Sequence, residues 1–297
     1  MSKASIYFGP AGWSYPDWQG IVYPKKKSRD FSELGFISRY FSTVEINSSF
    51  YRIPSLSTAK AWLRQVERHD GFKFCIKLWN RFTHTEFPLQ PEEVDQFGQI
   101  LQILANEDKL GAVLIQFPWR FKKSTKTMQR LFDITDRFAA FPCAVEFRHG
   151  SWQEEDVGQV LHERKIAFVN IDQPVIGDSL SPTEKVTADV GYVRLHGRNR
   201  AAWFADDAGR DERYNYLYSD AELGEWVTPI ERMREQTETT FIIFNNHFRG
   251  KALINAFQMM YLINEEKPIA PETLLRHFPA ANRFAKADLS GQTLQLF

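Results

Sequence analysis

Charged and amide side chains follow several apolar, strand-like runs in this chain of 297 residues. Glu146 and Arg148 end one such run, and Arg194 and His196 end another. A run that is hydrophobic on both faces is typical of a buried parallel strand, where an unpaired charge costs several kcal/mol. These groups are therefore expected to meet partners or a ligand. The residues at predicted strand ends are Glu45, Asn47, Lys77, Gln116, Glu146, Arg148, Asp172, Arg194, His196, Asn245 and Asn246.

The cations of this set favour an anion site. Lys77 offers a point charge, and Arg148 and Arg194 each offer a guanidinium fork that suits phosphate or carboxylate. The remaining polar groups are expected to orient the ligand. They are Glu45, Asn47, Gln116, Asn245 and Asn246.

Histidine, carboxylate and lysine side chains in the set are suited to move protons or attack a substrate. His196 is the predicted proton carrier, because an ordinary imidazole titrates near neutral pH. Glu146 or Asp172 is predicted to orient the imidazole or to act as the base. Lys77 lies near other cations, so a lowered pKa would make it a nucleophile or Schiff-base former, whereas an ion pair with a glutamate would make it structural.

Eight strand-like segments alternate with segments of helical periodicity. The predicted strands cover residues 5–9, 43–47, 72–77, 111–116, 142–147, 166–171, 190–195 and 240–245. No G-x-G-x-x-G turn follows any of them, so an open dinucleotide-binding sheet is disfavoured. The pattern predicts an α/β fold, a single (β/α)8 TIM barrel in which the polar strand ends surround one pocket.

Local signals predict where some helices begin and where one is missing. Ser151 with Glu154, and Ser219 with Glu222, each form the pattern of a capping box at a helix start. Residues 173–189 are rich in Pro, Gly, Asp and Ser and predict a loop in place of the sixth helix. A loop of this length at the barrel mouth suits a lid.

The composition gives no net charge that would attract a highly charged partner to the whole protein. Lysine plus arginine and aspartate plus glutamate number 37 each, so no net field attracts nucleic acid or an acidic membrane. No apolar stretch approaches the roughly 20 residues that span a bilayer, and no signal peptide opens the chain. Cys75 and Cys143 lie in apolar runs and are expected to be buried, reduced thiols. We expect a cytoplasmic protein that does not bind membranes.

Two other interpretations of the polar set stay open. Glu45, Glu146 and Asp172 balance the three cations, so the set could be a structural lattice of ion pairs. A divalent metal is a second alternative, since Glu45, Glu146, Asp172, His196 and His247 are suitable ligand types. No H-x-H or H-E-x-x-H spacing occurs and the nearby cations would repel a metal, so no metal or other cofactor is predicted.

Tryptophans follow several of the predicted strands. They are Trp13, Trp79, Trp119, Trp152 and Trp203. On the rim of a barrel, indole rings can stack on sugars, bases or arginine planes, or they can pack loops over the mouth. Trp13, Trp152 and Trp203 are predicted to contact the ligand.

Ordered motifs run from residue 5 to about residue 262. They include Gly-Pro-Ala-Gly-Trp-Ser-Tyr at 9–15, Thr-Val-Glu-Ile-Asn at 43–47, Ala-Val-Glu-Phe-Arg-His at 144–149, Tyr-Val-Arg-Leu-His-Gly-Arg at 192–198 and Phe-Asn-Asn-His at 244–247. Through them the chain resembles the YecE-like family, whose domain is of unknown function. The resemblance implies a TIM barrel and no established reaction. Phe117-Pro118 departs from the two prolines that are more usual in the family.

The chain beyond the barrel is expected to form a separate appendage. Residues 1–264 would be the barrel, and residues 265–297 would form a short helix at 272–277 and a flexible tail. The last six residues resemble the peptide by which bacterial proteins bind the replication sliding clamp, an interaction made by a short linear segment. The clamp-binding residues of that peptide would be Gln292, Leu294, Leu296 and Phe297.

These observations predict a barrel that binds an anionic small molecule, phosphorylated or nucleotide-like. If it is an enzyme, hydrolysis of a phosphate ester or a glycosyl bond is favoured, because no redox-cofactor motif occurs. One alternative is a nucleic-acid-binding or repair-associated barrel that its tail recruits to the sliding clamp. Another is a non-catalytic protein in which the charged ring is structural.

Overall fold

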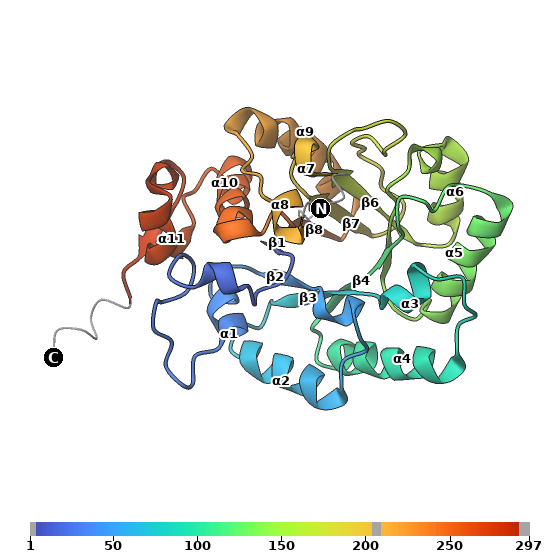
Figure 1. Cartoon of the computed structure of the whole chain (residues 1–297), viewed down its shortest axis with the longest axis horizontal. Helices are drawn as coiled ribbons and strands as arrows, with labels where there is room; N and C mark the ends of the chain where they lie inside the picture. Colours follow the sequence, from blue (N-terminus) through green and yellow to red (C-terminus); the bar gives the residue numbers. More distant parts are fainter. Residues whose placement is uncertain (1–3, 204–208, 291–297) are drawn as a thin grey trace.

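Eight parallel strands form one curved sheet with helices on its outer side (Figure 1). This computed structural model describes residues 4–203 and 209–290. The strands are β1 (Ser5–Pro10), β2 (Thr43–Ile46), β3 (Lys73–Lys77), β4 (Leu110–Gln116), β5 (Cys143–Glu146), β6 (Ala167–Asp172), β7 (Val190–Leu195) and β8 (Thr239–Phe244). Their order is β1-β8-β7-β6-β5-β4-β3-β2. The predicted (β/α)8 barrel is confirmed, and each strand lies within one residue of its expected bounds.

The barrel closes between β1 and β2, near the carboxyl ends of the two strands. Ala11 and Glu45 form an isolated bridge there, and the Gly12 amide donates to the Glu45 carbonyl at 2.9 Å. Gly9 allows the close approach, since a Cβ at this position would lie 1.8 Å from the carbonyl oxygen of Thr43. The closure therefore depends on a glycine in the middle of a strand.

Substituting this glycine should weaken the closure. We expect Gly9→Ala to lower the free energy of unfolding by about 1–3 kcal/mol, because the added methyl overlaps backbone that must move. Gly224→Ala is the matched control: this glycine is exposed in a helix, and a Cβ there meets no atom within 4 Å. Urea unfolding of both variants is the measurement. A Gly9→Ala protein as stable as the Gly224→Ala protein would contradict this account.

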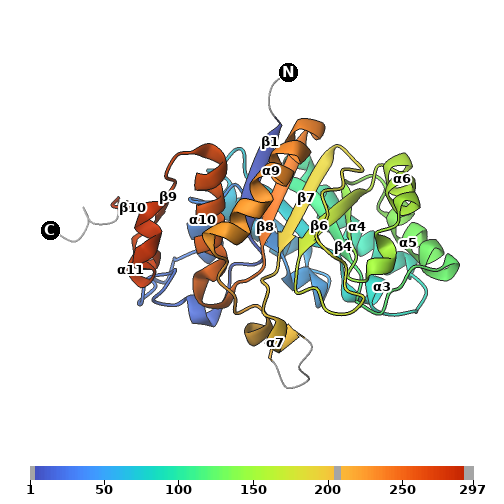
Figure 2. The same ribbon diagram turned by 90° about the horizontal axis from the view of Figure 1, so that it is seen from above.

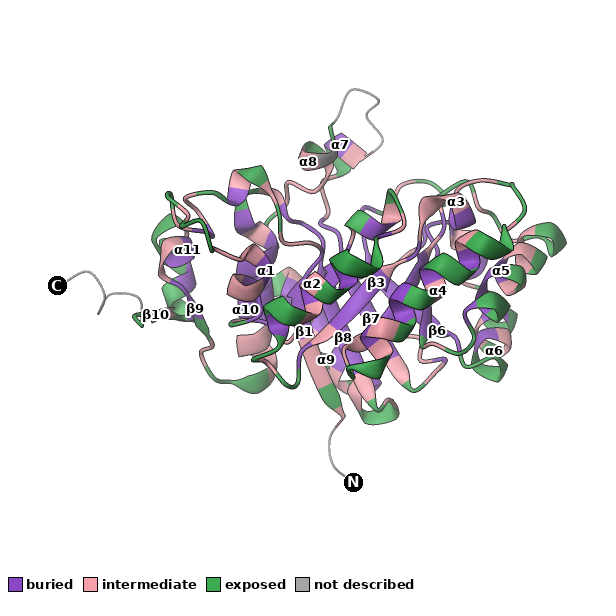
Figure 3. Cartoon of the chain, turned by 90° about the horizontal axis from the view of Figure 1, so that it is seen from below, coloured by how far each residue is buried: buried purple, intermediate pink, exposed green. Residues whose placement is uncertain are grey.

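The helices are α1 (Glu33–Ile37), α2 (Leu56–Val66), α3 (Asn80–Thr83), α4 (Pro91–Asn106), α5 (Thr125–Arg137), α6 (Glu155–Glu163), α7 (Arg200–Trp203), α8 (Arg210–Arg213), α9 (Asp220–Gln236), α10 (Lys251–Asn264) and α11 (Glu272–His277). The longer helices cover the barrel with their apolar faces, whereas α7 and α8 project from its mouth and α11 lies in the C-terminal appendage (Figure 2 and Figure 3). Figure 3 shows buried residues on the inner faces of α2 and α4 and exposed residues on their outer faces. In Figure 2, α9 and α10 lie against the part of the sheet formed by β1, β8 and β7. Cys75 and Cys143 are buried free thiols in the core, and burial raises the pKa of each to about 12.

One of the two expected capping boxes is present. The Ser219 hydroxyl accepts the Glu222 amide at the start of α9, and the Glu222 carboxylate accepts the Ser219 amide. The box predicted at Ser151 is wrong, because a 3-10 turn at Gly150–Trp152 precedes α6. The Ser151 hydroxyl instead accepts the Lys123 amide at 2.9 Å and ties the turn to the preceding loop.

Residues 173–189 form the expected loop, and no helix joins β6 to β7. The Asn170 side chain holds this segment: its Nδ2 donates to the Lys185 carbonyl at 2.9 Å, and its Oδ1 accepts the Thr183 hydroxyl at 2.7 Å. Leu180 is fully buried, and its amide donates to the Arg148 carbonyl at 2.8 Å. These contacts hold the loop against the end of β5, and a role as a lid stays a prediction.

The C-terminal appendage is more ordered than the sequence suggested. The expected helix is present as α11. It is joined by an unexpected pair of short parallel strands, β9 (Ile269–Pro271) and β10 (Lys286–Asp288). Helix α10 ends at Asn264, and the division between barrel and appendage near this residue stays a prediction. The clamp-like residues of the tail lie outside the described residues, so that interaction stays a prediction.

No helix in the described part of the chain is both long enough and apolar enough to cross a bilayer.

Candidate functional site

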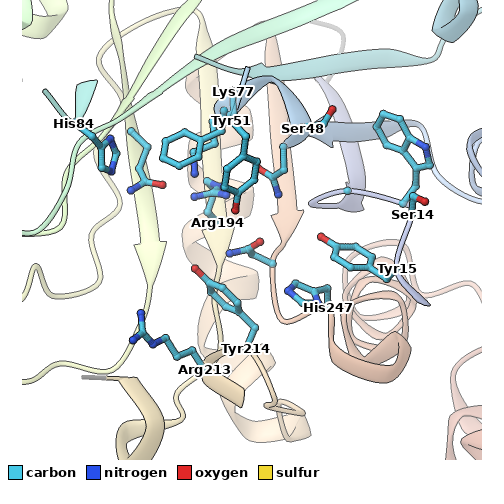
Figure 4. A pocket seen from close by; sticks show the side chains of 16 residues that line it. Ser14, Tyr15, Ser48, Tyr51, Lys77, His84, Arg194, Arg213, Tyr214 and His247 are labelled. Carbon is cyan, nitrogen blue, oxygen red and sulfur yellow. The ribbon is translucent and has the colours of Figure 1, made fainter. Parts of the chain in front are cut away.

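A cavity of about 590 Å³ opens at the carboxyl end of the barrel. Its walls come from the loops after β1, β2 and β8, from the ends of β3, β4 and β7, from His84 after α3, and from α8 and the residue after it. The residues that line it are Gly12, Trp13, Ser14, Tyr15, Asn47, Ser48, Phe50, Tyr51, Lys77, His84, Gln116, Arg194, Arg213, Tyr214, Asn245 and His247. Figure 4 shows the side chains of Tyr15, Tyr51 and Tyr214 directed toward the space beside Arg194. Among these lining residues are three lysines or arginines and no carboxylate.

Arg194 forms the base of the site. Its side chain, only 1% exposed, binds Glu45 through two bonds, from Nε to Oε2 at 2.9 Å and from Nη2 to Oε1 at 2.6 Å. The third nitrogen, Nη1, donates to Glu146. The Tyr192 hydroxyl adds a bond to Glu45 Oε2 at 3.0 Å. One guanidinium thus binds two carboxylates that are both fully buried behind the cavity wall.

Glu146 lies between two guanidinium groups. Arg148 Nε is 2.5 Å from Glu146 Oε1, and Arg194 contacts the other oxygen. Burial alone would raise the pKa of Glu146, but the charges of Arg148 and Arg194 outweigh burial and hold this pKa well below its usual range. Arg148 also donates from Nη1 to Gln173 Oε1 at 2.9 Å. Glu146 and Arg148 therefore form a buried ion pair, and neither is part of the cavity lining.

His196 is buried beside this ion-pair network. Its Nδ1 lies 3.0 Å from the Asn245 amide nitrogen, and its Nε2 lies 3.6 Å from Glu146 Oε1. An amide that donates to Nδ1 places the ring proton on Nε2, which faces Glu146. Burial, and then the charge of Arg148, lower the pKa of His196 well below its ordinary value. The lowered pKa favours the neutral imidazole, and a role of His196 in moving protons stays a prediction.

Lys77 differs from Arg148 and Arg194, the other two cations expected at the strand ends. None of the ion pairs among the described residues includes it, so the predicted pairing with Glu45 or Glu146 is not formed. Its Nζ lies 3.9 Å from the centre of the Phe50 ring. Burial, followed by the charge of Arg194, lowers the pKa of Lys77 to about 7, although Glu146 and Glu45 partly oppose the shift. Near neutral pH the amine is therefore divided between its charged and neutral forms.

The mouth of the cavity is built from aromatic side chains that the sequence did not single out as ligand contacts. Tyr15 stacks on His247 with ring centres 4.2 Å apart, and Tyr214 lies 5.5 Å from the same imidazole. His84 packs edge-on against Phe50 at 5.0 Å. Burial, and then the charge of Lys77, lower the pKa of His84 to about 4. The only sequence signal for these residues was their place in or beside the family motifs.

Asp172 lies outside the cavity, although it was expected in the site. Its carboxylate accepts Arg198 Nη2 at 2.7 Å, the Tyr218 hydroxyl at 2.8 Å and Trp226 Nε1 at 2.8 Å. Asn170, two residues earlier on β6, contacts Met233 of α9, so this face of the strand points away from the barrel interior. The geometry therefore gives Asp172 a structural role between β6 and α9.

Two other expected ligand contacts also lie away from the cavity. Trp152 is fully buried and stacks on Phe147, with ring centres 4.1 Å apart. Asn246 donates to the Tyr216 carbonyl at 2.9 Å and to Asn255 at 2.8 Å. By contrast, Trp13 lines the cavity, and Trp203 lies 5.8 Å from the Arg148 guanidinium. Of the remaining predicted residues, Asn47, Lys77, Gln116, Arg194 and Asn245 line the cavity, while Glu45, Glu146, Arg148 and His196 lie outside its lining.

Metal-binding side chains do not cluster in the part of the chain that the structure describes. No three histidine, cysteine, aspartate or glutamate side chains there are placed to share one ion. Glu45 and Glu146, two of the possible ligands, are already bound by arginine.

Comparison with known proteins identifies relatives along almost the whole chain. A family model described as "Protein of unknown function DUF72" matches residues 7–279. The UPF0759 protein YunF of Bacillus subtilis is 31% identical over 288 residues, which cover 91% of this chain and 99% of that protein. The UPF0759 protein YecE of Escherichia coli K12 is 25% identical over 174 residues, 56% of this chain and 59% of that protein.

Solved structures of similar proteins share the fold. A DUF72 family protein from Thermotoga maritima superposes with a TM-score of 0.77 at 31% identity and covers 88% of this chain and 99% of its own. A DUF72 family protein from Enterococcus faecalis gives a TM-score of 0.76 at 27% identity, with 87% and 95% covered. None of these descriptions states a reaction or a ligand.

Proposed function

This chain belongs to the DUF72 family, a family of unknown function that includes the YecE-like proteins, and we propose that its barrel cavity binds an anionic small molecule. The observation that carries the proposal is the charge of the lining, which contains Lys77, Arg194 and Arg213 and no carboxylate. Lys77 is half-buried and belongs to none of the ion pairs among the described residues, and a bound anion would supply an opposite charge at its amine. The volume of the cavity, about 590 Å³, is in the range of small-molecule sites.

The surroundings of the charges favour a ligand with a flat or polyhydroxylated part. Trp13 and Tyr51 line the cavity, and Tyr51 is 64% exposed, so its ring is open to stacking. Asn47, Gln116 and Asn245 add amide groups that can bind hydroxyls or ring nitrogens. This combination supports a phosphorylated sugar or a nucleotide over a small inorganic anion.

The arrangement supports only one of the two hydrolytic reactions considered from the sequence. Glycosyl hydrolysis generally needs two carboxyl groups on either side of the scissile bond. Glu45 and Glu146 are both bound by arginine and neither lines the cavity, so the geometry does not favour that reaction. For a phosphate ester, the charged form of Lys77 is suited to hold a phosphoryl oxygen, or its neutral form can accept a proton from water.

Anions should stabilise the protein against heat. We expect inorganic phosphate, glycerol 3-phosphate and AMP to raise the Tm in a phosphate-free buffer, since a ligand at one hundred times its Kd adds about 2.7 kcal/mol. Glycerol and adenosine, which lack the phosphate, should raise it much less. Sodium chloride at matched ionic strength separates specific binding from screening.

The same assay with variants locates the site. Lys77→Met should reduce the response to phosphate compounds, whereas Lys60→Met, which changes an exposed lysine on α2, should leave it intact. Equal responses to AMP and adenosine, or no response to any anion, would refute the proposal.

A further inference from the structure

We propose that Lys77 forms a Schiff base with the carbonyl carbon of an anionic aldehyde or ketone bound in the cavity. This inference rests on the proposed anion site, because the anionic group of the substrate would be held by the cations that share the cavity with Lys77. It adds the substrate class, a phosphorylated or carboxylated carbonyl compound, and names the atom that reacts.

The position of Lys77 suits a nucleophile. The residue ends β3, and its amine lies over the Phe50 ring instead of against a carboxylate. The backbone beneath it is fixed, because the Ser49 hydroxyl lies 2.6 Å from the Lys77 carbonyl and 2.9 Å from the carbonyl of Ile46. The side chain therefore extends from a rigid strand end into a cavity that Arg194 also lines (Figure 4). Such a site can hold an anionic substrate beside Arg194 and present its carbonyl to the amine.

The protonation state of Lys77 agrees with this role. Only a neutral amine has the lone pair that attacks a carbonyl carbon, and an ordinary lysine is neutral in roughly one molecule in 2,500 at pH 7. Burial and the charge of Arg194 lower the pKa of Lys77 to about 7, so a large fraction of the amine is neutral at that pH.

The reaction needs no external oxidant or reductant. The Nζ lone pair forms a bond to the carbonyl carbon, and the π electrons move to the oxygen, which takes up a proton. The nitrogen then loses a proton, the new hydroxyl group takes up a second proton, and it leaves as water as the C=N bond forms. Loss of the last proton from the nitrogen gives the imine. The hydroxyls of Tyr51 and Tyr214 line the same cavity and are candidates to pass these protons. The balance is one amine and one carbonyl compound giving one imine and one water.

Pyridoxal 5′-phosphate is a suitable probe, because it is an anionic aldehyde whose imine absorbs visible light. The full-length protein would be incubated with it near pH 7, reduced with sodium borohydride and mapped by peptide mass spectrometry. We expect Lys77 to be labelled about tenfold faster than the exposed Lys60, because more of its amine is neutral. Inorganic phosphate should slow labelling of Lys77 alone. Pyridoxal, which lacks the phosphate, should label Lys77 more slowly.

The variants and the phosphate titration separate this inference from the proposed function. Lys77→Met should abolish the rapid, phosphate-sensitive labelling and leave the slow labelling of surface lysines. Circular dichroism checks that this variant is folded. A phosphate-induced rise in Tm without preferential labelling of Lys77 would overturn the Schiff base and leave the anion site standing. Preferential labelling that phosphate does not slow would overturn the anion-guided reaction proposed here. If phosphate compounds give no thermal response at all, the proposed function itself fails.

Discussion

Replacing Arg194 with methionine should lower the free energy of unfolding by about 3–5 kcal/mol, the usual cost of breaking a buried ion pair by removing one partner. Arg194 is almost fully buried and binds Glu45 through two nitrogens and Glu146 through the third. Glu146 would keep Arg148 as a partner, but Glu45 would keep only the Tyr192 hydroxyl among the side-chain bonds described above. The destabilisation should therefore arise mainly from a buried, uncompensated carboxylate at position 45.

A second substitution tests that cause. Glu45→Gln removes the charge that Arg194→Met leaves unpaired, so the double variant should be clearly more stable than the Arg194→Met single variant. The measurement is urea unfolding of the wild type, both single variants and the double variant, with the coupling energy taken from the cycle. Arg198→Met, which affects the separate ion pair with Asp172, is the comparison for a partly exposed arginine.

Two results would contradict this account of the ion pairs. One is an Arg194→Met protein within about 1 kcal/mol of the wild type, the range of an exposed ion pair. The other is a double variant as unstable as the sum of the two single variants, since that would mean that the charges do not interact.

The polar residues at the strand ends fall into two groups, one that contains Arg194 and one that contains Lys77. Glu45, Glu146, Arg148 and Arg194 satisfy one another, as the structural interpretation of the sequence proposed. Lys77 belongs to none of these pairs and lines the cavity. Charge balance at the barrel end is therefore compatible with function, because the paired residues form a fixed wall and leave the amine of Lys77 for a ligand.

The fold was predictable because its signals are local and regular. Apolar runs mark each strand, and the alternation of strands with amphipathic helices indicates a barrel, whose carboxyl ends bring Glu45 and Arg194 together from distant parts of the chain. The same reasoning placed Lys77 in the site. It could not show which groups pair, because pairing depends on side-chain directions and distances between strands.

Some site predictions failed for physical reasons. Asp172 was placed in the site by its position at a strand end, but the alternation of side chains along β6 directs it toward α9. Trp152 follows a strand as the other rim tryptophans do, yet it belongs to a short turn that packs into the core. Tyr15, Tyr51 and Tyr214 were not predicted as ligand contacts, because loops carry no periodicity that indicates which way a side chain points.

Lys77→Met should stabilise the folded protein, and the gain should depend on pH. The pKa of Lys77 is about 7 in the folded protein against an ordinary value of 10.5, so between these values the unfolded chain holds a proton that the folded chain has released. Stability of the wild type therefore rises with pH across this window, by at most about 1.4 kcal/mol per unit. Below pH 7 both states are protonated, and the folded protein bears the full cost of a charged amine among arginines. The advantage of the variant should thus be greatest at low pH.

Urea unfolding from about pH 6 to about pH 9.5, in buffers without phosphate, measures this effect as the difference between variant and wild type. We expect the advantage of Lys77→Met to shrink by roughly 2–3 kcal/mol over that range, while other titrating groups cancel in the difference. Lys60→Met is the matched control, because its lysine is exposed on α2 and should give a difference that stays flat with pH. A flat difference for Lys77→Met as well would mean that Lys77 keeps an ordinary affinity for its proton. The neutral amine on which the Schiff base depends would then be too scarce near pH 7 for Lys77 to react faster than a surface lysine.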